Sequence, residues 1–149
     1  MTRQPDGRIV VGVDGSPLSL AAVRWAARLA AVTGGPLEAV TVWEFPCLLG
    51  EHGLVPPALD GFGPERHAAR ILDETLAAAL SSAGPAAGPS AVRRHLKAGA
   101  PGPALTGAAE GAAVLVLGSR GRAAPPGAAL GTVTQYCVHH APCTVVVVR

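Results

Sequence analysis

Aromatic residues make up only 3% of this 149-residue chain, and charged residues only 15%. The basic residues are scattered and the formal net charge is only +2, so we expect no nucleic-acid-binding surface. No apolar run is long enough to cross a bilayer, so we expect no membrane segment either. Hydrophobic residues nevertheless reach 49% of the chain, which predicts a soluble, folded protein rather than a disordered one.

Cysteine is also scarce. Cys47, Cys137 and Cys143 lack the C-x-x-C spacing of redox or zinc sites, and no signal peptide precedes them. An odd number of cysteines in such a chain indicates a reducing compartment, so we expect a cytoplasmic protein. The length predicts one domain, residues 1–149, that is large enough to bury a core without disulfide bonds.

Several enzyme motifs are missing as well. The chain has no G-x-x-x-x-G-K-[ST] loop for rapid nucleotide hydrolysis and no G-x-S-x-G nucleophile elbow. The first expected strand-to-helix turn, residues 12–15, lacks the G-x-G-x-x-G pattern of dinucleotide-dependent oxidoreductases. We therefore do not expect an enzyme, beyond at most slow ATP hydrolysis.

Short apolar segments alternate along the chain with segments of helical periodicity. The expected strands are 8–13, 37–43, 92–97, 112–117 and 144–148, and the expected helices are 17–33, 65–82, 101–110 and 133–140, with a long loop over 44–64. This alternation predicts an α/β fold, Rossmann-like or flavodoxin-like, in which helices cover both faces of a five-stranded parallel sheet. In the segment 92–97, Val92, Arg94 and Leu96 alternate with the polar residues at 93, 95 and 97. This period-two pattern is too polar for the centre of a sheet and indicates an edge strand.

A glycine-spaced loop follows the apolar strand 112–117. It begins with Gly118-Ser119-Arg120-Gly121 and reaches Gly131-Thr132 after nine further residues. Glycines allow the backbone to approach a ligand closely, and free amides at the start of a helix bind phosphates. Arg120 and Arg122 add positive charge. The alternative is that these glycines only form a tight turn and the arginines are solvated.

The last expected strand, 144–148, is almost entirely valine. An apolar strand at a sheet edge invites uncontrolled pairing unless something covers it. The simplest cover is the same strand of a second copy, so we expect a homodimer through Thr144 to Val148.

The chain resembles the universal stress protein (UspA-like) family, and its glycine spacing resembles the ATP-binding branch. The motifs that carry the resemblance extend over nearly the whole sequence. They are Ile-Val-Val-Gly-Val-Asp-Gly-Ser at 9–16, Val-Thr-Val-Trp at 40–43, the glycine loop at 118–121 and 131–132, and His-His-Ala-Pro-Cys at 139–143. The resemblance implies sheet order 3-2-1-4-5, dimerisation through the fifth strand, and ATP held between the ends of strands one and four.

The resemblance also implies roles for single residues. Asp14 would lie near the ribose and any nucleotide-bound Mg²⁺, and the backbone around Val42 would lie against the adenine. The predicted nucleotide-binding residues are Val13, Asp14, Val42, Gly118, Ser119, Arg120, Gly121, Arg122, Gly131, Thr132 and Val133. One departure from the family pattern is Pro125-Pro126 inside the spacer, which removes two amides. ADP or AMP is therefore expected to be able to replace ATP.

We therefore predict an ATP-binding regulatory protein of the stress response that acts as a nucleotide-dependent dimeric switch. One alternative is a dimeric interaction protein of the stress response that needs no nucleotide. Another is an adenylate-forming or nucleotidyl-transfer enzyme, which would need a second substrate pocket in the loop 44–64.

Overall fold

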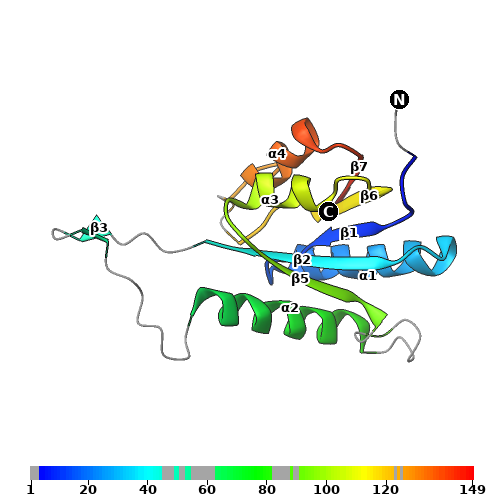
Figure 1. The fold of residues 1–149 in the computed structure, drawn as a ribbon, viewed down its shortest axis with the longest axis horizontal. Helices are drawn as coiled ribbons and strands as arrows, with labels where there is room; N and C mark the ends of the chain where they lie inside the picture. The colour runs from blue at the N-terminus through cyan, green and yellow to red at the C-terminus, as the bar shows by residue number, and fades with distance from the viewer. Residues whose placement is uncertain are drawn as a thin grey trace.

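The computed structural model describes residues 4–44, 49–50, 53–54, 63–81, 88, 91–122, 124 and 126–149. Its main sheet has five parallel strands (Figure 1). They are β1 (Ile9–Gly12), β2 (Leu37–Trp43), β5 (Arg93–Ala98), β6 (Val114–Gly118) and β7 (Thr144–Val148). The order across the sheet is β5-β2-β1-β6-β7. Numbered along the chain, these strands have the order 3-2-1-4-5, which confirms the predicted fold class.

Helices cover both faces of this sheet (Figure 1). They are α1 (Pro17–Thr33), α2 (Pro64–Leu80), α3 (Pro101–Ala108) and α4 (Thr132–His140). Helices α1 and α2 share one hydrophobic core with the sheet, and α3 and α4 share the other. Successive residues of β1 point to opposite faces of the sheet. Val10 packs in the core under α3, and Val11 packs in the core under α1. Strands buried on both faces in this way produce the continuous apolar runs seen in the sequence.

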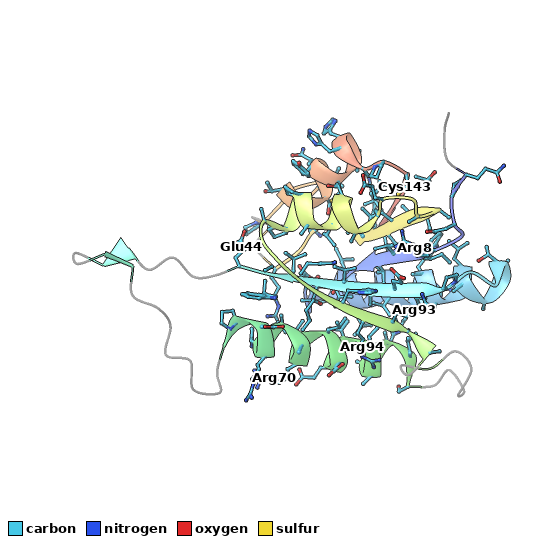
Figure 2. All side chains as sticks on the ribbon, viewed as in Figure 1. Arg8, Glu44, Arg70, Arg93, Arg94 and Cys143 are labelled. Carbon is cyan, nitrogen blue, oxygen red and sulfur yellow. The ribbon has the colours of Figure 1, made fainter. Side chains whose placement is uncertain are left out.

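The edge strand β5 is polar, as its sequence predicted. Arg94 points toward α2, where its Nε donates a hydrogen bond to the Asp73 carboxylate at 2.8 Å (Figure 2). Arg93 lies on the other face of the strand and is exposed. An edge strand lacks a neighbour on one side, so charged side chains there cost little and hinder pairing with other chains.

The described part of the predicted long loop contains a small two-stranded antiparallel sheet. It pairs β3 (Leu49–Gly50) with β4 (Gly53–Leu54). The expectation of a loop without regular structure over 44–64 was wrong at these residues. Strands of two residues are too short to show the alternating pattern from which strands are recognised in a sequence.

Cys137 belongs to the core under α3 and α4 and is fully buried. Its burial raises the pKa of the thiol from 9.0 to about 11. Burial also raises the pKa of the half-buried Cys143. Cys47 lies outside the described residues.

We predict that Cys137 resists alkylation by iodoacetamide at about pH 8, because a thiolate is the reactive species and this thiol stays protonated and covered. Peptide mass spectrometry after labelling of the native and the guanidinium-unfolded protein measures modification of each cysteine separately. Cys137 should be labelled only in the unfolded sample, and rapid labelling in the native protein would contradict its placement in the core.

Among the residues that the structure describes, no helix has the length and apolarity needed to cross a membrane.

Candidate functional site

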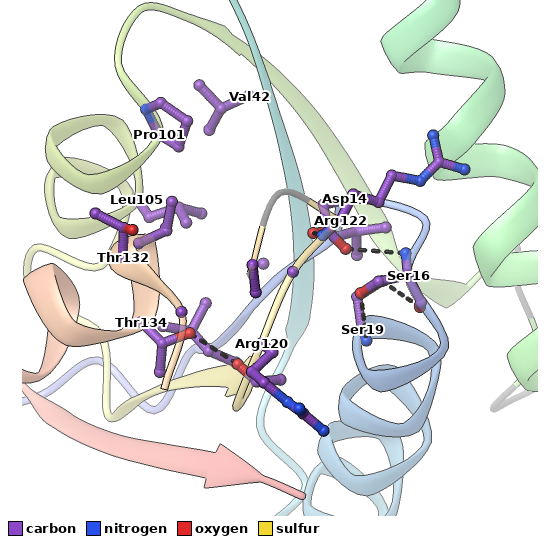
Figure 3. Close-up of a pocket in the computed structure, with 18 of the residues that line it drawn as sticks. Asp14, Ser16, Ser19, Val42, Pro101, Leu105, Arg120, Arg122, Thr132 and Thr134 are labelled. Atoms are coloured by element: carbon purple, nitrogen blue, oxygen red, sulfur yellow. Dashed lines mark hydrogen bonds between the residues drawn. The ribbon is translucent and has the colours of Figure 1, made fainter. Parts of the chain in front are cut away.

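A cavity of about 300 Å³ opens where β1, β2 and β6 end (Figure 3). In parallel α/β sheets, ligands bind at the carboxyl ends of the strands, and this cavity lies there. One part of its wall is apolar and is formed by Val40, Val42, Pro101, Leu105 and Leu117. These side chains come from β2, α3 and β6, and they offer a flat ring system a hydrophobic environment.

Another part of the wall is formed by the glycine loop and the first turn of α4, where Thr132 lies beside Leu105 (Figure 3). Gly131 is the N-cap of this helix and provides no side-chain hydrogen bond to it. The first three amides of a helix have no intrahelical acceptor, so those of Thr132, Val133 and Thr134 need partners from elsewhere. They also carry the positive end of the helix dipole. This turn is therefore suited to an anionic group.

Helix α4 has an amide hydrogen at its first position, which the other described helices lack. Those begin with Pro17, Pro64 and Pro101, which have no amide hydrogen to offer at the first helical position. Helix α4 begins with Thr132 and keeps that donor.

The N-terminus of α1 also faces the cavity, but it is already capped. The Ser16 hydroxyl accepts a hydrogen bond from the Ser19 amide at 3.2 Å, and the Asp14 carboxylate accepts one from the Ser16 amide at 2.9 Å (Figure 3). Helix α3 also begins at the cavity, at Pro101, and has no side-chain cap, but Pro101 and Pro103 lack amide hydrogens. Of the described helices that begin at the cavity, α4 is therefore the one that presents three consecutive uncapped amides.

The glycine loop is held in place by its own hydrogen bonds. The Gly131 amide donates to the Ser119 carbonyl at 2.8 Å, and the Ser119 amide donates to the Val148 carbonyl at 2.7 Å. The Thr134 hydroxyl donates to the Gly118 carbonyl at 2.8 Å, which joins the start of α4 to the end of β6 (Figure 3). These bonds join the two ends of the loop to each other and to β7 and α4.

Asp14 connects the turn after β1 to the glycine loop. Besides the Ser16 amide, its carboxylate accepts a hydrogen bond from the Arg122 amide at 3.0 Å. A Cβ atom on Gly121 would collide with this carboxylate, so a larger residue there would have to displace the Asp14 side chain from its two hydrogen bonds.

Asp14 is also the residue that could contribute a protein ligand to Mg²⁺. It is the only carboxylate among the described residues that line the cavity, and no described group of three or more metal-binding side chains exists. One carboxylate fits an ion that is bound mainly by nucleotide phosphates, as Mg²⁺ commonly is, and does not fit an ion held by protein side chains alone.

The two arginines line the cavity but turn their guanidinium groups away from its centre. That of Arg122 lies over Gly15 beside Ile71, on the side of α2, and that of Arg120 points along α1 (Figure 3). Neither has the orientation expected for a phosphate contact, so that role stays a prediction for both.

All of the predicted nucleotide-binding residues line this cavity except Ser119. Ser119 is only 4% exposed, and its backbone serves the internal hydrogen bonds of the loop. Sequence reasoning missed Pro101 and Leu105 of α3 and Thr134 of α4. The two α3 residues lie in a helix whose sequence contains prolines and glycines, so its helical pattern was weak and drew no attention to them. Thr134 follows Thr132 at a helix start, which is a signal for hydroxyl contacts that could have been used.

A sequence model described as the universal stress protein family matches residues 7–149. The universal stress protein Rv2623 of Mycobacterium tuberculosis is 32% identical over 149 residues, covering 95% of this chain and 47% of that protein. Rv1996 of the same species is 34% identical over 145 residues, covering 89% of this chain and 45% of that protein. The chain thus spans about half the length of these relatives.

Solved structures of similar fold cover the whole chain. The universal stress protein UspA from Lactobacillus plantarum has a TM-score of 0.73 and 25% identity, covering 99% of this chain and 100% of that one. A universal stress protein in complex with cAMP has a TM-score of 0.66 and 27% identity, covering 98% of both chains. One from Archaeoglobus fulgidus in complex with dAMP has a TM-score of 0.59 and 22% identity, covering 100% of both, and shows likeness of fold.

Proposed function

Because the chain belongs to the universal stress protein family, we propose that it is a regulatory protein of the stress response that binds an adenine nucleotide in the cavity at the ends of β1 and β6. The observation that carries this proposal is the uncapped first turn of α4 beside an apolar wall in one cavity. A nucleotide has one apolar, planar end and one anionic end, and the cavity has a matching surface for each.

The base would lie against Val42, Pro101 and Leu105, and a phosphate would accept hydrogen bonds from the amides of Thr132 and Val133. That a relative at 27% identity is described in complex with cAMP supports an adenine nucleotide as the ligand. We propose ATP as the nucleotide, with ADP and AMP able to replace it, and Mg²⁺ as an ion that arrives with the phosphates beside Asp14.

The nucleotide acts in this proposal as a ligand that is hydrolysed slowly or not at all. A ligand that binds only the folded state stabilises it by about 2.7 kcal/mol at a hundred times its dissociation constant. Occupancy alone can therefore change how ordered the glycine loop is and which surface the protein offers to a partner.

We further propose that the protein is a homodimer that pairs through β7. This strand is hydrogen-bonded to β6 on one side, and its valines are only half-buried. Pairing with the same strand of a second copy would cover both its free edge and this apolar surface.

The second candidate is a dimeric interaction protein of the stress response that needs no nucleotide. The observation in its favour is that the loop amides of Ser119, Arg122, Ala124 and Gly131 already have acceptors within the chain. A loop that is complete without a ligand can serve as a purely structural element.

Calorimetric titration of nucleotide-stripped protein with ATP, ADP and AMP, with and without Mg²⁺, distinguishes the two candidates. Sedimentation of the same samples measures the oligomeric state. Micromolar binding together with a nucleotide-dependent change in the dimer supports the switch. A dimer that binds none of the three nucleotides at millimolar concentration would overturn it in favour of the interaction protein, and a monomer under all conditions would overturn the proposed β7 pairing.

A further inference from the structure

We propose that Asp14 makes the site sensitive to the number of phosphates, so that a nucleoside triphosphate needs a divalent cation to bind and a monophosphate does not. This inference rests on the proposed nucleotide binding and adds a selectivity to it. Its basis is the carboxylate of Asp14, which already occupies a position that an anionic ligand would otherwise use: it accepts hydrogen bonds from the amides of Ser16 and Arg122 at 2.9 and 3.0 Å.

This carboxylate lies close to the first turn of α4. Gly121 packs so tightly against it that a Cβ atom on Gly121 would collide with Oδ2. Gly131, the N-cap of α4, in turn packs against Gly121, since a Cβ on Gly131 would come within 3.4 Å of the Gly121 amide nitrogen. Only one glycine therefore separates the Asp14 carboxylate from the helix end that would hold a phosphate.

Several other backbone donors near this point are already used. The amides of Ser119, Arg122 and Gly131 have acceptors within the protein. The α1 terminus is capped by Ser16, and Pro126 has no amide hydrogen. The first turn of α4 offers three consecutive amides that the helix itself does not use, and one such turn suits one phosphate group.

The positive charges nearby do not offset the carboxylate in this arrangement. The Arg122 guanidinium lies over Gly15 on the side of α2, and the Arg120 guanidinium points along α1 (Figure 3). A second and third phosphate would have to pass the negatively charged Asp14 or extend into solvent. Mg²⁺ removes this repulsion because it binds phosphate oxygens and a carboxylate together.

The expected size of the effect follows from Coulomb's law. Two like charges a few ångströms apart near a protein surface repel each other, and water and salt screen this repulsion only in part. A reduction of ATP affinity by about tenfold in the absence of Mg²⁺ is therefore a modest expectation, because tenfold corresponds to only about 1.4 kcal/mol.

The test titrates AMP and ATP into the full-length protein by calorimetry, in EDTA and in Mg²⁺. Three proteins are compared: the native chain, Asp14→Asn and Asp73→Asn. The Ser16 amide bonds to Oδ1 of Asp14 and the Arg122 amide to Oδ2, so asparagine at position 14 can accept only one of these two hydrogen bonds. Circular dichroism and thermal unfolding therefore verify that Asp14→Asn is folded before its affinities are compared. Asp73→Asn removes the same charge from the exposed face of α2, outside the cavity lining, and is the matched control.

In EDTA, the native protein and Asp73→Asn should bind AMP about tenfold or more tightly than ATP, and Mg²⁺ should restore ATP binding. Asp14→Asn should bind ATP in EDTA about tenfold more tightly than the native protein does, with AMP affinity much less changed. If Asp14 were only a ligand of Mg²⁺, this substitution would leave ATP binding in EDTA unchanged, which overturns the proposal.

Equal affinities of the native protein for AMP and ATP in EDTA would also overturn it and would show that Arg120 and Arg122 turn inward to neutralise the added phosphates. If AMP and ATP bind but the selectivity is absent, the proposed function stands and only this inference fails. If neither nucleotide binds under any condition, both fail.

Discussion

Replacing Thr132 with proline should weaken adenine-nucleotide binding by about tenfold or more, because a hydrogen bond to a charged group contributes about 1.5–3 kcal/mol. Proline removes the first amide of α4, which has no other acceptor in the helix. It should not disturb the helix itself, since proline is favoured at this position and already begins α1, α2 and α3. The preceding Gly131 has the extended backbone, φ −71° and ψ 160°, that proline requires of its neighbour.

Thr132→Ala is the control for this experiment, because it removes the same hydroxyl group and keeps the amide. Calorimetric titration gives the affinities of both variants, and circular dichroism and thermal unfolding verify that both are folded. The expected order of affinity is native, then Thr132→Ala close behind, then Thr132→Pro far below. Equal losses in the two variants would mean that the hydroxyl binds the ligand, and no loss in either would mean that the phosphate lies away from α4.

The sheet could be predicted from the sequence because each strand position has a distinct environment. Strand β6 is buried on both faces and has an almost entirely apolar sequence, whereas β5 lies at an edge and is rich in charged residues. The pairing of β3 with β4 was missed because two residues per strand leave no pattern. Strands were thus predicted correctly where burial produces a regular pattern of apolar residues. They were missed where the strand is too short to show such a pattern.

The site was predictable in part for a similar reason. The glycine spacing of 118–131 reflects close backbone packing, and this packing restricts the residue type at single positions. The apolar wall contributed by Pro101 and Leu105 comes from α3, which lies outside the glycine loop, and the crossover from β5 to β6 brings it to the cavity. The sequence around these two residues does not indicate that they line a cavity, so they looked like ordinary core positions.

For Asp14, the sequence predicted the location of the side chain but not all of its contacts. Its position after a central strand placed it correctly in the cavity, and the family resemblance suggested contact with ribose or a metal ion. Its hydrogen bond to the Arg122 amide spans more than a hundred residues of sequence and could not be inferred from spacing. A carboxylate was thus recognised as functional, but what it holds in the absence of a ligand became visible only in the structure.

Gly118 provides the second prediction of large effect, and it concerns stability. A Cβ atom on Gly118 would come within 2.8 Å of the Leu18 Cβ and 2.9 Å of the Leu18 carbonyl carbon. A backbone atom cannot move aside by rotating a side chain, so α1 as a whole would have to shift away from β6. Overpacking of this kind typically costs about 1–3 kcal/mol, and we expect Gly118→Ala to lower the free energy of unfolding by that amount.

Gly107→Ala is the matched control, because Gly107 lies in α3 and a Cβ there would meet nothing within 4 Å. Alanine within a helix is favoured over glycine by about 0.5–1 kcal/mol, so this variant should be stabilised. Urea unfolding followed by circular dichroism measures both. Opposite signs for the same chemical change would show that Gly118 is needed for the contact between α1 and β6 rather than for turn flexibility. If Gly118→Ala proved as stable as the native protein, α1 would not approach the end of β6 as closely as the structure shows. The position of the Ser16 cap beside the glycine loop would then be incorrect as well.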